Sequence, residues 1–67
     1  MWSKELQEQT KEFLEEYKMA AMKHFGDSVY GVCVLKEDKY SITEHESNIV
    51  HKFESIEALI NDGWAID

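Results

Sequence analysis

The sequence contains no arginine, one cysteine and no long apolar run. Cys33 has no second cysteine with which to pair, and its position in the apolar segment VYGVCVL predicts a buried, unreactive thiol. A single free cysteine suits a reducing cytoplasm. No segment approaches the roughly 20 apolar residues of a transmembrane helix, and the N-terminal MWSKELQEQ does not resemble a signal peptide. We therefore expect a cytoplasmic protein without a membrane partner.

The charged residues are strongly unbalanced. Seven lysines stand against fourteen acidic residues, which gives a net charge of −7. Most of the excess lies in residues 27–67, which hold nine acids and three lysines. Nucleic acid is not expected as a direct ligand, because neutralising its phosphates requires a basic patch. An acidic surface suits a basic partner, or serves solubility alone.

The first 26 residues predict one long helix. Ser3 is a suitable N-cap, and Glu5 in the first turn interacts favourably with the helix dipole. Gly26 is a natural C-terminal stop, so we expect the helix over residues 3–25. Its apolar side is formed by residues at spacings of three and four: Leu6, Thr10, Phe13, Leu14, Tyr17, Ala20, Ala21 and His24 or Phe25.

The remainder of the chain predicts three strands and a short helix. Residues 29–35 are β-branched or apolar, KEDK supplies a polar turn, and residues 40–45 alternate as a strand does. A turn at ESN leads to a third strand, residues 49–53, and connections this short make consecutive strands antiparallel. Ser55 caps a helix over IEALIND that ends at Gly63, with Trp64 packing back on it. The predicted fold class is α+β in one domain, residues 1–67, with the order α-β-β-β-α: a long N-terminal helix, a three-stranded antiparallel sheet and a short C-terminal helix.

The sequence predicts no catalytic residues, no metal site and no cofactor. His45 and His51 lie six residues apart with acids nearby, but zinc sites need a third or fourth ligand at tight spacing. His24 suits the C-terminal end of a helix, where a cation is ordinary. No Gly-rich phosphate loop, Ser-His-Asp grouping or Cys-His motif is present in the sequence. We therefore do not expect an enzyme.

The acids of the predicted sheet are the candidate binding residues. Glu37 and Asp38 lie in the first turn, and Glu44 and Glu46 share the face of Tyr40 on the second strand. Strand residues on one face lie ~6.7 Å apart, close to the ~6.8 Å spanned by two steps along one DNA strand. An acidic strand could therefore imitate a phosphate backbone. The alternative is a solvated hairpin whose charges discourage edge-to-edge aggregation.

The segment KYSITEHESNIVHKF, followed by a helix that ends in NDGW, resembles a family of small phage-encoded anti-CRISPR proteins. That family shows a strand opening with an acid and tyrosine, a turn rich in Ser, Glu and Asn, an Ile-Val-x-Lys-Phe segment, and a helix ended by Asn-x-Gly-Trp. The resemblance lies within residues 38–64. It implies an acidic surface that mimics DNA and blocks the site where a type II-A RNA-guided DNA nuclease recognises its short flanking motif. It also implies a phage protein that acts in the host cell cytoplasm. The residues that carry it are Tyr40, Ile42, Glu44, Glu46, Ser47, Ile49, Val50, Lys52, Phe53, Asn61, Gly63 and Trp64.

Two hypotheses follow. The first is an inhibitor that binds a basic, nucleic-acid-binding protein, such as a CRISPR effector nuclease. Its partner-binding residues are Glu37, Asp38, Tyr40, Glu44 and Glu46. The second is a non-catalytic adaptor or regulatory module that forms a weak homodimer on the long helix. Its interface residues are Trp2, Leu6, Phe13, Met19 and Met22.

Overall fold

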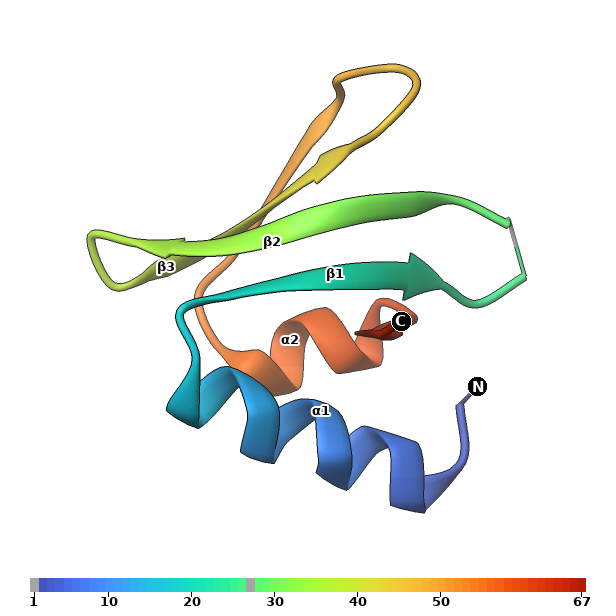
Figure 1. The fold of residues 1–67 in the computed structure, drawn as a ribbon, viewed down its shortest axis with the longest axis vertical. Helices are drawn as coiled ribbons and strands as arrows, with labels where there is room; N and C mark the ends of the chain where they lie inside the picture. Colours follow the sequence, from blue (N-terminus) through green and yellow to red (C-terminus); the bar gives the residue numbers. More distant parts are fainter. Residues whose placement is uncertain (1, 27) are drawn as a thin grey trace.

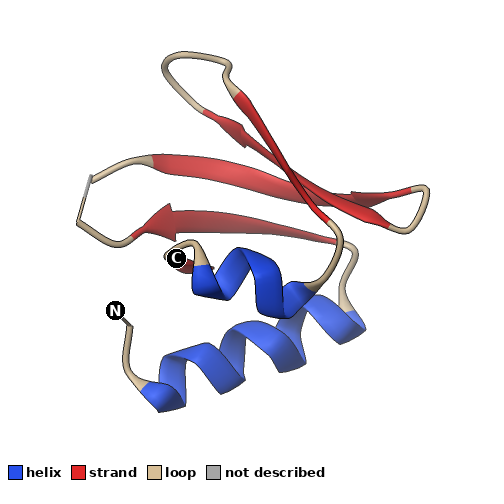
Figure 2. Ribbon diagram, turned by 180° about the vertical axis from the view of Figure 1, so that it is seen from behind, coloured by secondary structure: helices blue, strands red, loops and turns tan. Residues whose placement is uncertain are grey.

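The computed structural model describes residues 2–26 and 28–67. The elements follow the order α1 (Lys4–Glu16), β1 (Met19–His24), β2 (Tyr30–Lys36), β3 (Lys39–Glu44), β4 (Val50–Phe53), α2 (Ile56–Asn61) and β5 (Trp64–Ile66). The five strands form one antiparallel sheet with the order β4-β3-β2-β1-β5. Both helices lie on the same side of this sheet, as Figures 1 and 2 show. Among the described residues, no helix has the length and apolar character needed to cross a membrane.

The α+β class, the N-terminal helix, the antiparallel sheet and the short C-terminal helix are confirmed, whereas the number of strands is wrong. The sheet has five strands where three were predicted. The predicted strands correspond to β2, β3 and β4. The two additional strands, β1 and β5, lie where the sequence predicts the second half of the long helix and the segment after the C-terminal helix.

The long helix over residues 3–25 is the main error, because α1 ends at Glu16. Ser3 does cap it, since its hydroxyl accepts a hydrogen bond from the Leu6 N–H at 3.2 Å. The last turn contains Glu15 and Glu16 and no basic residue, so its charges oppose the helix dipole. Tyr17 is already extended, with φ −110° and ψ 139°. The helix therefore stops about nine residues before the predicted end.

Strand β1 shows the alternation of a sheet in place of helical periodicity. Ala20 and Met22 are buried, whereas Met19 and Ala21, which alternate with them along the strand, are exposed. The segment MAAMKH is rich in helix-favouring residues, but here it fills the position between β2 and β5. Gly26 is not a helix stop: it has φ +89° and lies in the connection from β1 to β2. His24 is likewise at the end of a strand.

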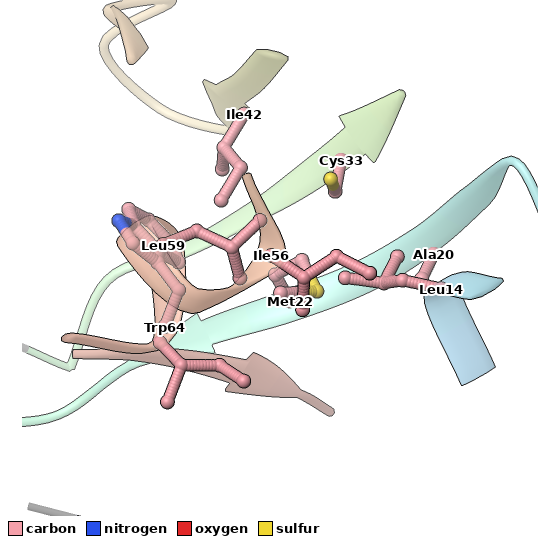
Figure 3. Close-up of a cluster of buried hydrophobic side chains, with 9 residues drawn as sticks. Leu14, Ala20, Met22, Cys33, Ile42, Ile56, Leu59 and Trp64 are labelled. Atoms are coloured by element: carbon pink, nitrogen blue, oxygen red, sulfur yellow. The ribbon is translucent and has the colours of Figure 1, made fainter. Parts of the chain in front are cut away.

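The core lies between the sheet and the two helices (Figure 3). Leu14 is the buried apolar residue of α1, and α2 contributes three more. Cys33 and Ile42, which face each other across β2 and β3, are fully buried, so the predicted burial of Cys33 is confirmed. The apolar residues of the core cluster are Leu14, Ala20, Met22, Cys33, Ile42, Ile56, Leu59, Ile60 and Trp64.

Helix α1 also covers one edge of the sheet. Thr10 is fully buried, and its hydroxyl donates to the Leu6 carbonyl at 2.8 Å. The same hydroxyl accepts a hydrogen bond from the Ile66 N–H of edge strand β5 at 3.1 Å. Because this edge N–H already donates a hydrogen bond within the protein, it does not donate to a strand of another chain. Strand β4 is the other edge of the sheet.

The predicted helical dimer surface does not exist as one surface. Met22 is fully buried in the core, whereas Met19 is 61% exposed on the opposite face of β1. Trp2 packs on the domain and does not extend beyond it: its indole N–H donates to the Gly63 carbonyl at 2.6 Å. Its ring lies edge-on to Phe25, with centroids 5.2 Å apart. The long helix that the adaptor hypothesis requires is therefore absent: α1 contains Leu6 and Phe13, whereas Met19 and Met22 lie in β1.

Candidate partner-binding site

An open hollow of about 460 Å³ lies at one end of the sheet. Residues 28–30 and the loop from β3 to β4 both line it. The β2–β3 turn lies at the other end of β2 and β3 (Figure 1). We call this feature the sheet-end hollow. Its lining includes three acidic residues, Glu44, Glu46 and Asp67, and none of its described lining residues is a lysine. The complete lining is Ala21, Met22, Ser28, Val29, Tyr30, Glu44, His45, Glu46, Ser47 and Asp67.

Backbone hydrogen bonds hold the β3–β4 loop in one shape. The His45 N–H donates to the Tyr30 carbonyl at 2.9 Å, which ties the loop to β2. The Glu44 N–H donates to the Ile49 carbonyl at 2.9 Å, and the Asn48 N–H donates to the Glu44 carbonyl at 3.2 Å. Asn48 has φ +61°, a conformation that asparagine tolerates better than most residues. The loop therefore presents its acids from a defined backbone.

Glu44 is the most strongly held acid of the hollow. One carboxylate oxygen lies 2.5 Å from His51 Nε2, and the other accepts a hydrogen bond from the Ser47 hydroxyl at 2.8 Å. The Glu44 side chain is only 17% exposed. The hydrogen bond with His51, followed by the one from Ser47, lowers the pKa of Glu44 below its ordinary value. Glu44 is therefore a fixed negative charge at neutral pH.

The third acid, Asp67, reaches the hollow through strand β5. The Asp67 N–H donates to the Ala21 carbonyl at 3.0 Å and so continues the pairing of β5 with β1. Tyr30 at the start of β2 lines the same hollow and is 50% exposed. An exposed aromatic ring beside carboxylates is suited to bind a cation.

The five predicted site residues do not form one surface. Glu44 and Glu46 both line the hollow. Glu37 and Asp38 form the β2–β3 turn, with φ values of +53° and +64°, as a two-residue type I′ turn requires. Strand β3 separates this turn from Glu44 by about 20 Å. Tyr40 packs against the core, and this burial is the first cause that raises its pKa.

Sequence reasoning missed Asp67 and Tyr30. Asp67 reaches the hollow only because β5 pairs with β1, and a three-residue strand has too few positions to show alternation. Tyr30 was assigned to a strand, but its position beside the β3–β4 loop depends on strand register. The acid-rich turn after residue 43 was the one local signal of the hollow.

The acids and the Tyr30 ring suit the hollow to binding a cationic side chain.

Cys33 is not part of the hollow. Burial raises the pKa of its thiol to about 11, so the thiol is protonated at neutral pH and lies in the core. The Ser47 hydroxyl donates to the Glu44 carboxylate and so ties the β3–β4 loop to the end of β3. Among residues 2–26 and 28–67, no group of three or more His, Cys, Asp or Glu side chains is arranged to hold a metal ion.

Comparisons of the chain with models of protein families, with curated proteins and with solved structures give no match.

Proposed function

We propose that the protein is a small non-catalytic inhibitor that binds a basic, nucleic-acid-binding protein through the sheet-end hollow. The observation that carries the proposal is the gathering of Glu44, Glu46 and Asp67 around one hollow whose described lining holds no lysine. These carboxylates take the place of nucleic-acid phosphates before the basic side chains of the partner. The resemblance to anti-CRISPR proteins supports the same kind of partner, an RNA-guided DNA nuclease.

Arginine is the side chain that fits this hollow best. Its guanidinium forms two parallel hydrogen bonds with a carboxylate and also stacks on aromatic rings. Tyr30 supplies an exposed ring beside the acids. In RNA-guided nucleases, arginines read the bases of the flanking motif. An inhibitor that occupies such arginines competes with the target DNA.

The role of Glu37 and Asp38 follows from their position. Both are exposed at the β2–β3 turn, at the other end of the sheet from the hollow. They belong to the proposed surface only if the partner spans about 20 Å along β3. We therefore place Glu44, Glu46 and Asp67 at the centre of the contact and the turn acids at its rim.

The test measures inhibition and binding with one defined enzyme, a purified type II-A RNA-guided nuclease carrying its guide. The wild-type protein is expected to bind it, to compete with the target duplex and to lower the cleavage rate. Binding should weaken as salt rises, because the contacts are Coulombic. Failure to bind excludes this nuclease; the same competition is then measured on DNA-binding proteins retained from a lysate and eluted with duplex DNA.

The matched variants separate the hollow from overall charge. Glu44→Gln, Glu46→Gln and Asp67→Asn remove three charges from the hollow, and Glu8→Gln, Glu12→Gln and Glu15→Gln remove three from α1. Circular dichroism verifies the fold of each variant. We expect the hollow variant to lose more than tenfold in affinity, because ion pairs desolvated at an interface are worth several kcal/mol. Equal losses from the two sets would mean that net charge alone acts, and full retention by the hollow variant would refute the proposal.

A further inference from the structure

One face of the sheet is not covered by either helix, and we call it the open face. Strand register places Met19, Val34, Ser41 and Lys52 in one row across β1, β2, β3 and β4. The neighbouring row consists of Ala21, Val32, Thr43 and Val50. Met19 is 61% exposed, Val50 49% and Val34 38%. Met19 and Val34 are neighbours, and Ser41 and Thr43 of β3 lie between them and Val50. Large apolar side chains exposed on one sheet face indicate an interaction surface.

The charged residues of β1 to β4 on the open face are lysines, whereas Asp67, which follows β5 opposite Ala21, is an acid at the edge of this face. Along β1 to β4, the described residues whose side chains alternate onto this face include four lysines and no acid. Lys36 and Lys39 lie opposite each other in the strand register beside the β2–β3 turn, and Lys52 lies on edge strand β4. Lys23 lies over the Trp2 ring at 5.0 Å, and Lys39 pairs with Glu54 at 3.1 Å. The lysines thus lie at the strand ends and on the β4 edge, around the apolar residues of β1 and β2, as in an interface with an apolar centre and a charged rim.

Helix α1 carries the complementary surface on the other side of the molecule. Thr10 and Leu14 face the core, so the opposite side of the helix faces away from the sheet. At 3.6 residues per turn, the five glutamates of α1 fall within an arc of about 100° on that outer side. Phe13 lies to one side of the arc and Tyr17 just beyond the helix end, with rings 4.7 Å apart and exposed fractions of 38% and 52%. The glutamates of this stripe are Glu5, Glu8, Glu12, Glu15 and Glu16.

We propose that the open face of one copy binds the outer side of α1 of a second copy, head to tail. Four lysines around an apolar centre meet five glutamates beside two exposed rings. An acidic partner is required, because a second open face would oppose lysines to lysines. The two surfaces differ and lie on opposite sides of the molecule, so the contact does not close around a two-fold axis. Further copies can therefore add to a growing chain.

Sedimentation equilibrium from micromolar to millimolar protein tests the proposal. The weight-average mass of the wild-type protein is expected to rise through that of a dimer without a plateau. The open-face variant carries Lys36→Gln and Lys52→Gln, and the helix variant carries Glu12→Gln, Glu15→Gln and Glu16→Gln. Each is expected to weaken association at least tenfold. For the helix variant this is opposite to the effect of net charge, because removing acids from an acidic protein reduces its self-repulsion.

Mixing the two variants gives the decisive measurement. The open-face variant keeps an intact helix and the helix variant keeps an intact open face, so an equimolar mixture should form a 1:1 dimer and grow no further. Circular dichroism verifies that both variants are folded. Glu46→Gln, in the β3–β4 loop, serves as the control and should associate at least as strongly as the wild type. A monomer mass for the wild type throughout, a plateau at the dimer, or a mixture that stays monomeric would overturn the proposal, whatever the outcome of the nuclease experiment.

Discussion

Gly63 joins three parts of the fold at a single residue. It follows α2 with φ +112°, a left-handed conformation that glycine adopts at little cost. Its carbonyl accepts hydrogen bonds from the Trp2 indole at 2.6 Å and from the Phe25 N–H at 2.8 Å. A Cβ atom at this position would lie 2.9 Å from His24 Nε2. Residue 63 therefore has both a conformational and a steric reason to be glycine.

Gly63→Ala is expected to destabilise the protein by about 1–3 kcal/mol or more, because backbone strain and a steric clash act together. Gly26→Ala is the matched control. Gly26 also has a positive φ, +89°, but among the described residues other than its chain neighbours no heavy atom lies within 4 Å of a Cβ placed there. Its substitution should cost the backbone strain alone. Urea unfolding of both variants measures the difference, and equal midpoints would mean that the contact with His24 is relieved at no cost.

At the scale of elements, side-chain hydrogen bonds stabilise the β3–β4 hairpin in addition to the backbone hydrogen bonds between its two strands. Glu44 at the end of β3 bonds His51 on β4 and Ser47 in the loop between them. These two hydrogen bonds lower the pKa of Glu44 from its ordinary value of 4.5. A group whose pKa is lowered by folding stabilises the fold when it is ionised. The stabilisation is therefore present above pH 4.5 and is lost as the pH falls through the lowered pKa.

Glu44→Gln should unfold at lower urea concentration than the wild type at pH 7. The difference between the two midpoints should shrink as the pH is lowered below the ordinary glutamate pKa of 4.5. Glu54→Gln makes the same change at a side chain 86% exposed, in a surface pair with Lys39. Because exposed pairs contribute little, its midpoint should follow that of the wild type. A pH-independent gap between Glu44→Gln and the wild type would contradict the role assigned to the carboxylate.

At the scale of the whole molecule, charge is separated between the two layers. The outer side of α1 carries five glutamates, whereas the lysines of β1 to β4 lie on the open face. Along α1, Glu8 and Glu12 are four residues apart, as are Glu12 and Glu16, so like charges repel within the helix. This repulsion costs stability, and a surface that binds lysines is one reason to keep it.

Glu12→Lys should therefore stabilise the fold and weaken self-association. The lysine converts two repulsive pairs into attractive ones, for a gain of about 0.5–1 kcal/mol in unfolding free energy. Thermal unfolding at low salt measures the gain, and sedimentation measures the association. A lowered melting temperature would contradict the placement of Glu12 on the solvent side of α1. Stronger association would contradict the head-to-tail contact.

Local features of the fold were predictable from the sequence because they depend on near neighbours in the chain. The Ser55 hydroxyl caps α2 at Ala58 N, 3.1 Å away, and Gly63 ends that helix as its residue type indicates. The β2–β3 hairpin follows from alternation around a polar turn. The burial of Cys33 follows from an apolar run. In each case the residue types that specify the structure lie within a few positions of it.

The tertiary structure decided the features that depend on distant partners. MAAMKH favours a helix by propensity, and it becomes β1 because β2 and β5 pair with its two edges. WAI is too short to be recognised as a strand without β1 beside it. For the same reason, Asp67 joins Glu44 and Glu46 at the sheet-end hollow only after β5 is placed. Short-range patterns specify caps and turns, whereas pairing across the sheet determines which acids gather at the hollow and which lysines lie on the open face.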